Sequence, residues 1–134
     1  MAVLSRKQMK FLDRLFYNAP ALEKAVAELR AEAASAAMQS VDPTSREAVV
    51  NIMPVNYAMG YDDPEQWLQV VAMTWARFHV HTGIGAAMRK RYRKNESPEL
   101  ICATEHIGVN TFFVWRKEFL LFAAFSAARK NLKF

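Results

Sequence analysis

Cationic side chains gather in one short run of the sequence: Arg89, Lys90, Arg91, Arg93 and Lys94. Guanidinium and ammonium groups pair with phosphate, so such a run is a candidate contact for a polyanion. Residues 1–85 hold eight Lys and Arg against nine Asp and Glu, whereas residues 86–134 hold ten against four. Net charges of −1 and +6 therefore place the predicted basic surface in the C-terminal part of the chain.

The residues that follow this run have the spacing of two helices joined by a tight turn. Ser97 and Pro98 suit the cap and first position of a helix. Gly108 suits a turn that needs a positive φ, Val109 would fill the angle between the helices, and Asn110 would cap the second helix. This order predicts a helix-turn-helix. The residues expected between its helices are Leu100, Ile101, Ala103, Ile107 and Val114.

The exposed side of the second helix, from Thr111 onward, would carry the residues that read DNA. Arginine makes bidentate contacts with guanine, and threonine can contact the methyl group of thymine. An ordinary pair of packed helices fits the same glycine turn, and Phe112 and Phe113 could face either the core or DNA. The predicted DNA-binding residues are Arg89, Lys90, Arg91, Arg93, Lys94, Asn110, Thr111, Trp115, Arg116 and Lys117.

Three features of the last fifty residues resemble the end of phage transcriptional regulators of the RinA/ArpU type. These are Arg91-Tyr92 at the end of a helix, the turn Ile107-Gly108-Val109 and a long closing helix. In that family the final helix-turn-helix is similar to the promoter-reading region of sigma factors. The resemblance implies a phage- or prophage-type transcriptional regulator whose partner is double-stranded DNA. RNA polymerase or another host complex would be a further partner.

Residues of catalytic or metal-binding type form no recognisable set in this sequence. His79 and His81 are two positions apart and would point to different sides of a helix, and Cys102 is the single cysteine. The sequence has no glycine-rich phosphate loop, nucleophile elbow or zinc-protease motif. We therefore expect no enzyme activity, no metal site and no cofactor.

Composition and periodicity predict an all-α fold: a small helical bundle that ends in the helix-turn-helix and a long C-terminal helix. Hydrophobic residues make up 52% of the chain and charged residues 23%, and there are only four glycines and five prolines. We expect residues 1–85 to form an N-terminal helical core region and residues 86–134 the basic helix-turn-helix region. The two regions would belong to one compact domain.

Caps and breaks divide the first part of the chain into shorter elements. Ser5 would cap a first helix, Asn18-Ala19-Pro20 would break it, and a second helix would run from Pro20 to about Met38. A short helix would begin at Asp42-Pro43 and run through Ala48–Val50. Another would begin at Asp63-Pro64 and is expected to be the central buried helix. The remaining expectations are an irregular connection at 51–63 and interruptions at Gly83 and Gly85.

The expected location and partners follow from apolar patterning. The first ten residues lack the apolar segment of a signal peptide, and the run Phe119–Phe125 is too short to span a bilayer. We expect a soluble cytoplasmic protein (host cytoplasm if phage-encoded) with no membrane partner. An apolar stripe on the last helix predicts core packing, a homodimer surface, or both. The alternative functions are a phage-encoded inhibitor or adaptor of a host complex and a small terminase-like subunit that packages DNA.

Overall fold

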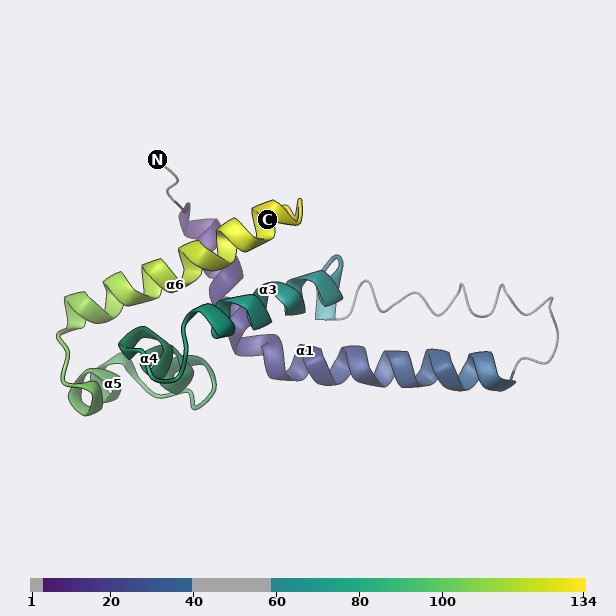
Figure 1. Cartoon of the computed structure of the whole chain (residues 1–134), viewed down its shortest axis with the longest axis horizontal. Helices are drawn as coiled ribbons and strands as arrows, with labels where there is room; N and C mark the ends of the chain where they lie inside the picture. Colours follow the sequence, from purple (N-terminus) through teal and green to yellow (C-terminus); the bar gives the residue numbers. More distant parts are fainter. Residues whose placement is uncertain (1–3, 40–58) are drawn as a thin grey trace. The chain divides into compact units, whose positions relative to one another are not determined.

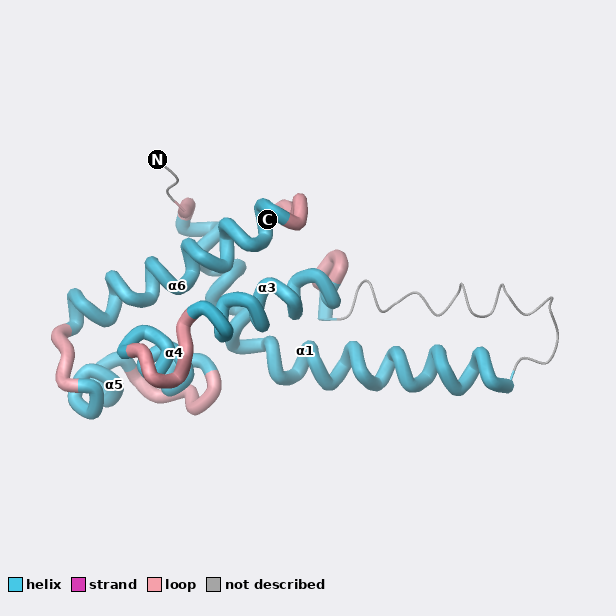
Figure 2. The backbone as a smooth tube through the Cα atoms, viewed as in Figure 1, coloured by secondary structure: helices cyan, strands magenta, loops and turns pink. Residues whose placement is uncertain are grey.

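Five α-helices account for the regular structure in residues 4–39 and 59–134, which are the residues that the computed structural model describes (Figures 1 and 2). No strand occurs in these two ranges, so the predicted all-α class is confirmed. The helices are α1 (Arg6–Gln39), α3 (Pro64–Arg77), α4 (Gly83–Tyr92), α5 (Pro98–Glu105) and α6 (Val109–Arg129).

Helix α1 begins at the predicted cap but does not break where a break was expected. The Ser5 hydroxyl accepts a hydrogen bond from the Gln8 amide (3.1 Å), and the Gln8 side chain accepts one from the Ser5 amide (3.0 Å). The predicted break at Asn18–Pro20 is wrong, because α1 continues through Pro20. Proline inside a helix costs about 3 kcal/mol. Buried apolar residues of α1 nevertheless continue from before Pro20 to after it, and their burial favours an unbroken helix. Those residues are Leu12, Leu15, Phe16, Ala19, Leu22 and Val26.

Several predicted elements lie outside the described residues. These are the short helix from Asp42-Pro43 through Ala48–Val50 and most of the connection at 51–63, which fall within residues 40–58.

Helix α3 starts where the sequence predicted, with Pro64 as its first residue. The Asp63 carbonyl accepts hydrogen bonds from the amides of Gln66 (2.9 Å) and Trp67 (3.1 Å). The expectation of a helix buried on several sides is only partly met, because Met73 is 40% exposed. The buried face consists of Trp67, Val70, Val71, Thr74 and Trp75.

Contacts divide the chain into two compact units. Unit 1 comprises residues 1–17 and 70–134, and unit 2 comprises residues 18–69. The predicted boundary after residue 85 falls inside unit 1 and stays a prediction. In unit 2, Arg30 pairs with Glu65 at 2.7 Å.

The core of unit 1 is built around aromatic rings from α1, α3, α4 and α6. The ring centroid of Phe119 lies 4.7 Å from that of Phe16 and 4.9 Å from that of Trp75. Tyr92 lies 5.5 Å from Phe16. All four rings are at most 8% exposed. Because these rings come from the start and the end of the chain, unit 1 can form only when residues far apart in the sequence come into contact.

The glycines at 83 and 85 belong to the start of α4 and do not interrupt a helix. Thr82 caps α4, and its hydroxyl accepts a hydrogen bond from the Gly85 amide at 2.9 Å. A Cβ atom at Gly85 would collide with the main-chain carbonyl of His79. The tight connection from α3 to α4 therefore requires glycine at this position.

We predict that Gly85→Ala lowers the free energy of unfolding by about 2 kcal/mol or more, because the added methyl group must displace backbone. Gly108→Ala is the matched control, since a Cβ there meets nothing within 4 Å and its φ is −80°. Both free energies of unfolding are measured by urea titration, and that of the control should fall by less than about 1 kcal/mol. Equal losses in the two variants would contradict the assigned role of Gly85.

Candidate nucleic-acid interface

The connection between α5 and α6 has the expected order of elements but a different turn. The Ser97 hydroxyl caps α5 as predicted and accepts a hydrogen bond from the Leu100 amide at 3.2 Å. The left-handed residue is His106 (φ 56°), not Gly108, which has an extended φ of −80°. Helix α6 starts at Val109 with Gly108 as its cap, so the predicted capping role of Asn110 is also wrong.

Shifting the turn moves the buried positions of both helices. Val109 (49% exposed), Val114 (52% exposed) and Ala103 were expected between the helices, but all three are exposed. Leu100, also expected there, is 47% exposed. Ile101 is buried as predicted, and Cys102 and Phe112 are buried as well. Cys102 lies four positions before the left-handed residue and Phe112 six positions after it. The order helix, turn, helix is present, and the helix-turn-helix as a DNA-binding motif stays a prediction.

Helices α4, α5 and α6 all pack against one another. Their packing separates the two neighbouring phenylalanines of α6: Phe112 is 1% exposed and belongs to the core, while Phe113 is 46% exposed. The structure therefore places Phe112 in the core and Phe113 at the surface.

Arg89, the first residue of the basic run, is held inside the fold. Its guanidinium donates hydrogen bonds to the carbonyls of Phe78 (2.8 Å), Gly85 (3.1 Å) and Trp75 (3.2 Å), and it lies 4.8 Å from the centre of the Trp75 ring. Burial lowers its pKa, and the positive charge of Arg93 lowers it further. Two of its acceptors lie at the C-terminal end of α3, where a cation is favourable.

Lys90 and Arg91 also have partners within unit 1. Lys90 pairs with Glu105 at 2.7 Å and donates to the Thr104 hydroxyl at 3.0 Å. Arg91 donates to the carbonyl of Glu96 at 3.0 Å. These contacts fasten α4 to α5 and to the segment between them.

Arg116, a predicted base-reading residue, instead joins α6 to α1. It donates to the Asp13 carboxylate through Nε (3.2 Å) and Nη2 (3.0 Å), and the Tyr92 hydroxyl donates to the same oxygen at 2.7 Å. Burial and the neighbouring carboxylate raise the pKa of Tyr92. Burial alone would lower the pKa of Arg116, but the charge of Asp13 and the two hydrogen-bonded partners raise it overall.

The ten predicted contact residues thus divide into two groups. Arg89, Lys90, Arg91, Trp115 and Arg116 are partly or largely buried. Trp115 packs so closely on Gly83 that a Cβ there would lie 2.7 Å from its Cη2 atom. The exposed group comprises Arg93, Lys94, Asn110, Thr111 and Lys117.

The charge of unit 1 is larger than the sequence division suggested. Unit 1 holds 15 Lys and Arg against 5 Asp and Glu, a net charge of +10, whereas unit 2 holds 3 against 8, a net charge of −5. The difference arises because the start of α1, with a net charge of +3, and Arg77 belong to unit 1. The sequence interpretation missed four exposed cations in that segment, although their helical spacing was visible: Arg6, Lys7, Lys10 and Arg14.

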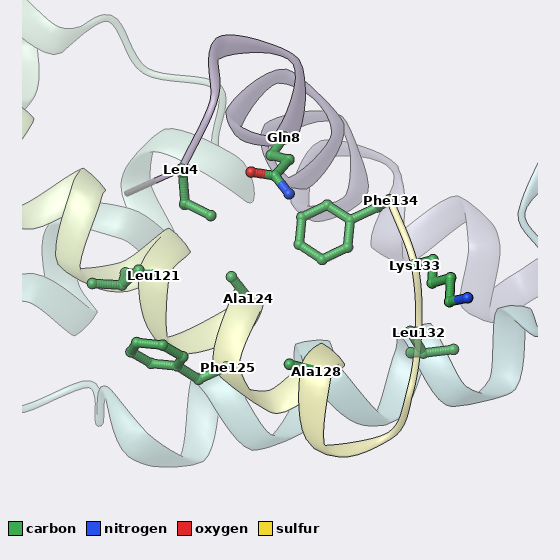
Figure 3. Close-up of a pocket in the computed structure, with 9 residues that line it drawn as sticks. All are labelled: Leu4, Gln8, Leu121, Ala124, Phe125, Ala128, Leu132, Lys133 and Phe134. Atoms are coloured by element: carbon green, nitrogen blue, oxygen red, sulfur yellow. The ribbon is translucent and has the colours of Figure 1, made fainter. Parts of the chain in front are cut away.

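A separate apolar groove of about 400 Å³ lies between residues 4–8 and residues 121–134 (Figure 3). In Figure 3 the ring of Phe134 and the side chain of Gln8 face its centre, with Phe125 at its edge. Phe125 is 51% exposed. The lining residues are Leu4, Gln8, Leu121, Ala124, Phe125, Ala128, Leu132, Lys133 and Phe134.

Within the described ranges, His, Cys, Asp and Glu residues form no group of three or more that could hold a metal ion. In the same ranges every helix is too short or too polar to cross a bilayer. Comparison of the chain with protein-family models, with curated proteins and with solved structures finds no match.

We predict that Asp13→Asn lowers the free energy of unfolding by about 2 kcal/mol, because it leaves the guanidinium of Arg116 without a charged partner. Breaking a fully buried pair costs about 3–5 kcal/mol, and the value here is smaller because both side chains are about a quarter exposed. Glu65→Gln is the control, since it breaks a pair whose arginine is 64% exposed. The midpoint of thermal unfolding should fall in Asp13→Asn and should stay at the value of the unmodified protein in Glu65→Gln. Equal midpoints in the two variants would refute the assignment.

Proposed function

We propose that this chain is a double-stranded DNA-binding protein, a transcriptional regulator of the phage or prophage type. The observation that carries the proposal is the net charge of +10 on unit 1, the unit that contains α4, α5 and α6. A polyanion such as duplex DNA gains most of its affinity from cations of this kind, through release of condensed counterions. The acidic unit 2 confines that attraction to one part of the chain.

The exposed start of α6 would provide the sequence-reading contacts. Asn110 and Thr111 are exposed in its first turn, and Lys117 follows about two turns later. Asparagine can make bidentate hydrogen bonds with adenine, and threonine can contact a thymine methyl group. Arg93 and Lys94 would contact phosphates, which orient a protein on the duplex without reading its sequence. Arg89 and Arg116 would act indirectly, by holding the helices in place.

A homodimer would suit this function, because two weak half-site contacts combine into a stronger one. The groove beside Phe125 supports this part of the proposal, since a half-exposed aromatic side chain borders an apolar hollow on the same helix. A two-fold interface can place each Phe125 in the hollow of the other copy. The protein would act in the cytoplasm of the host cell.

A second candidate function is that of an adaptor or inhibitor that binds a host complex such as RNA polymerase. The observation that favours it is the apolar character of the exposed corner formed by α5 and the start of α6. Grouped exposed apolar side chains mark protein interaction sites more often than DNA interfaces. Those side chains are Leu100, Val109, Phe113 and Val114, each between 46% and 52% exposed.

Fluorescence anisotropy with a mixed-sequence duplex tests the proposed function. The Lys94→Gln/Lys117→Gln variant should bind at least about threefold more weakly than the unmodified protein at 0.1 M salt, because two cations that contact the duplex are lost. Lys24→Gln/Arg129→Gln removes the same charge from exposed positions outside the proposed contact. Its affinity should change less, and an equal loss in both variants would contradict the assigned contact.

The second candidate predicts a different pattern. In that case the protein binds no duplex even at low salt, and immobilised purified RNA polymerase retains it. Phe113→Ser/Val114→Ser should then abolish retention, because both side chains would be buried at the interface. Tight duplex binding together with no retention would exclude this candidate.

A further inference from the structure

The first three turns of α1 carry a basic stripe, defined as Arg6, Lys7, Lys10 and Arg14. Each residue of an α-helix turns the side-chain direction by about 100°, so these four positions fall within an arc of about 100°. All four side chains are exposed. The opposite side of the same turns is buried, with Leu12 and Leu15 at 0% exposure and Phe16 at 1%. The stripe is therefore a single cationic face on a helix that is anchored by its other face.

No acid of the described segment 4–17 neutralises this stripe. Its one acidic residue, Asp13, accepts hydrogen bonds from Arg116 and Tyr92. The sign of the charge then changes along the same helix, because the part of α1 in unit 2 carries exposed Glu23, Glu28 and Glu32. If these side chains served only solubility, charges of either sign would suffice. The exposed charges of α1 within unit 1 are instead all positive.

We propose that the basic stripe is a second phosphate-binding surface of unit 1, in addition to the contacts at the start of α6. This inference rests on the proposed DNA-binding function and extends it to an element outside the helix-turn-helix. From Arg6 to Arg14 the helix rises by about 12 Å. The same length of duplex carries about seven phosphate charges, so four cations can each face a phosphate.

The burial of the opposite face favours duplex DNA over a membrane surface as the partner. A basic helix that lies on a membrane inserts its apolar face among the lipid chains. Here the apolar side chains of Leu12, Leu15 and Phe16 are in the core and cannot insert. The hydrogen bonds from Arg116 to Asp13 also tie this part of α1 to α6, so the stripe and the start of α6 belong to one folded unit.

The test compares two full-length variants that each lose four positive charges. The stripe variant is R6Q/K7Q/K10Q/R14Q, and the matched control is K24Q/R30Q/R77Q/R129Q, with every substituted position exposed. Binding of a mixed-sequence duplex is measured across a salt series. The slope of log K against log salt concentration should become shallower by about 2 to 4 in the stripe variant, since each phosphate contact contributes about 0.9. The control should change the slope by less than about 1.

The outcomes separate this inference from the proposed function. If the unmodified protein binds no duplex at low salt, the proposed function and the stripe assignment both fail. If it binds and the two variants have equal slopes, only the stripe assignment fails. The half variants R6Q/R14Q and K7Q/K10Q should each give about half of the slope change, which decides the question if the fourfold variant does not fold.

Discussion

The carboxylate of Asp13 is the contact on which the arrangement of unit 1 depends. One of its oxygens accepts hydrogen bonds from Tyr92 on α4 and from two nitrogens of Arg116 on α6, so three helices meet at a single atom. A partly buried guanidinium needs a charged partner, and its partner comes from the opposite end of the chain. The start of α1 thereby joins the C-terminal helices and adds +3 to the net charge of unit 1.

The cations of unit 1 serve two different purposes. Arg89, Lys90 and Arg116 satisfy carbonyl groups or carboxylates within the fold, and their removal would act first on stability. Exposed cations such as Lys94 and Lys117 are available to a partner. Sequence alone cannot separate the two groups, because an arginine in a basic run looks the same whether it contacts a carbonyl or a phosphate. The separation follows only from which residues are buried.

The success of the sequence predictions depended on the range of the interactions involved. Local signals located the Ser97 cap of α5, the Pro64 start of α3 and the long closing helix correctly, because each depends on a few neighbouring residues. The turn was misplaced by two residues, since glycine is usually favoured at positive φ but His106 adopts it here. The pairing of Asp13 with Arg116 spans 103 residues, and no local pattern indicates it. The continuity of α1 through Pro20 likewise depends on tertiary burial that outweighs helix propensity.

The most direct test of the account is a titration of the isotope-labelled protein with duplex DNA, followed by the amide and arginine Nε–H signals in NMR spectra. The account predicts shifts at the amides of residues 6–14 and 109–117. It also predicts that the amides of residues 20–35 do not shift and that the Arg89 and Arg116 Nε–H signals keep their positions. Shifts concentrated in residues 20–35, or no shifts at low salt, would contradict it.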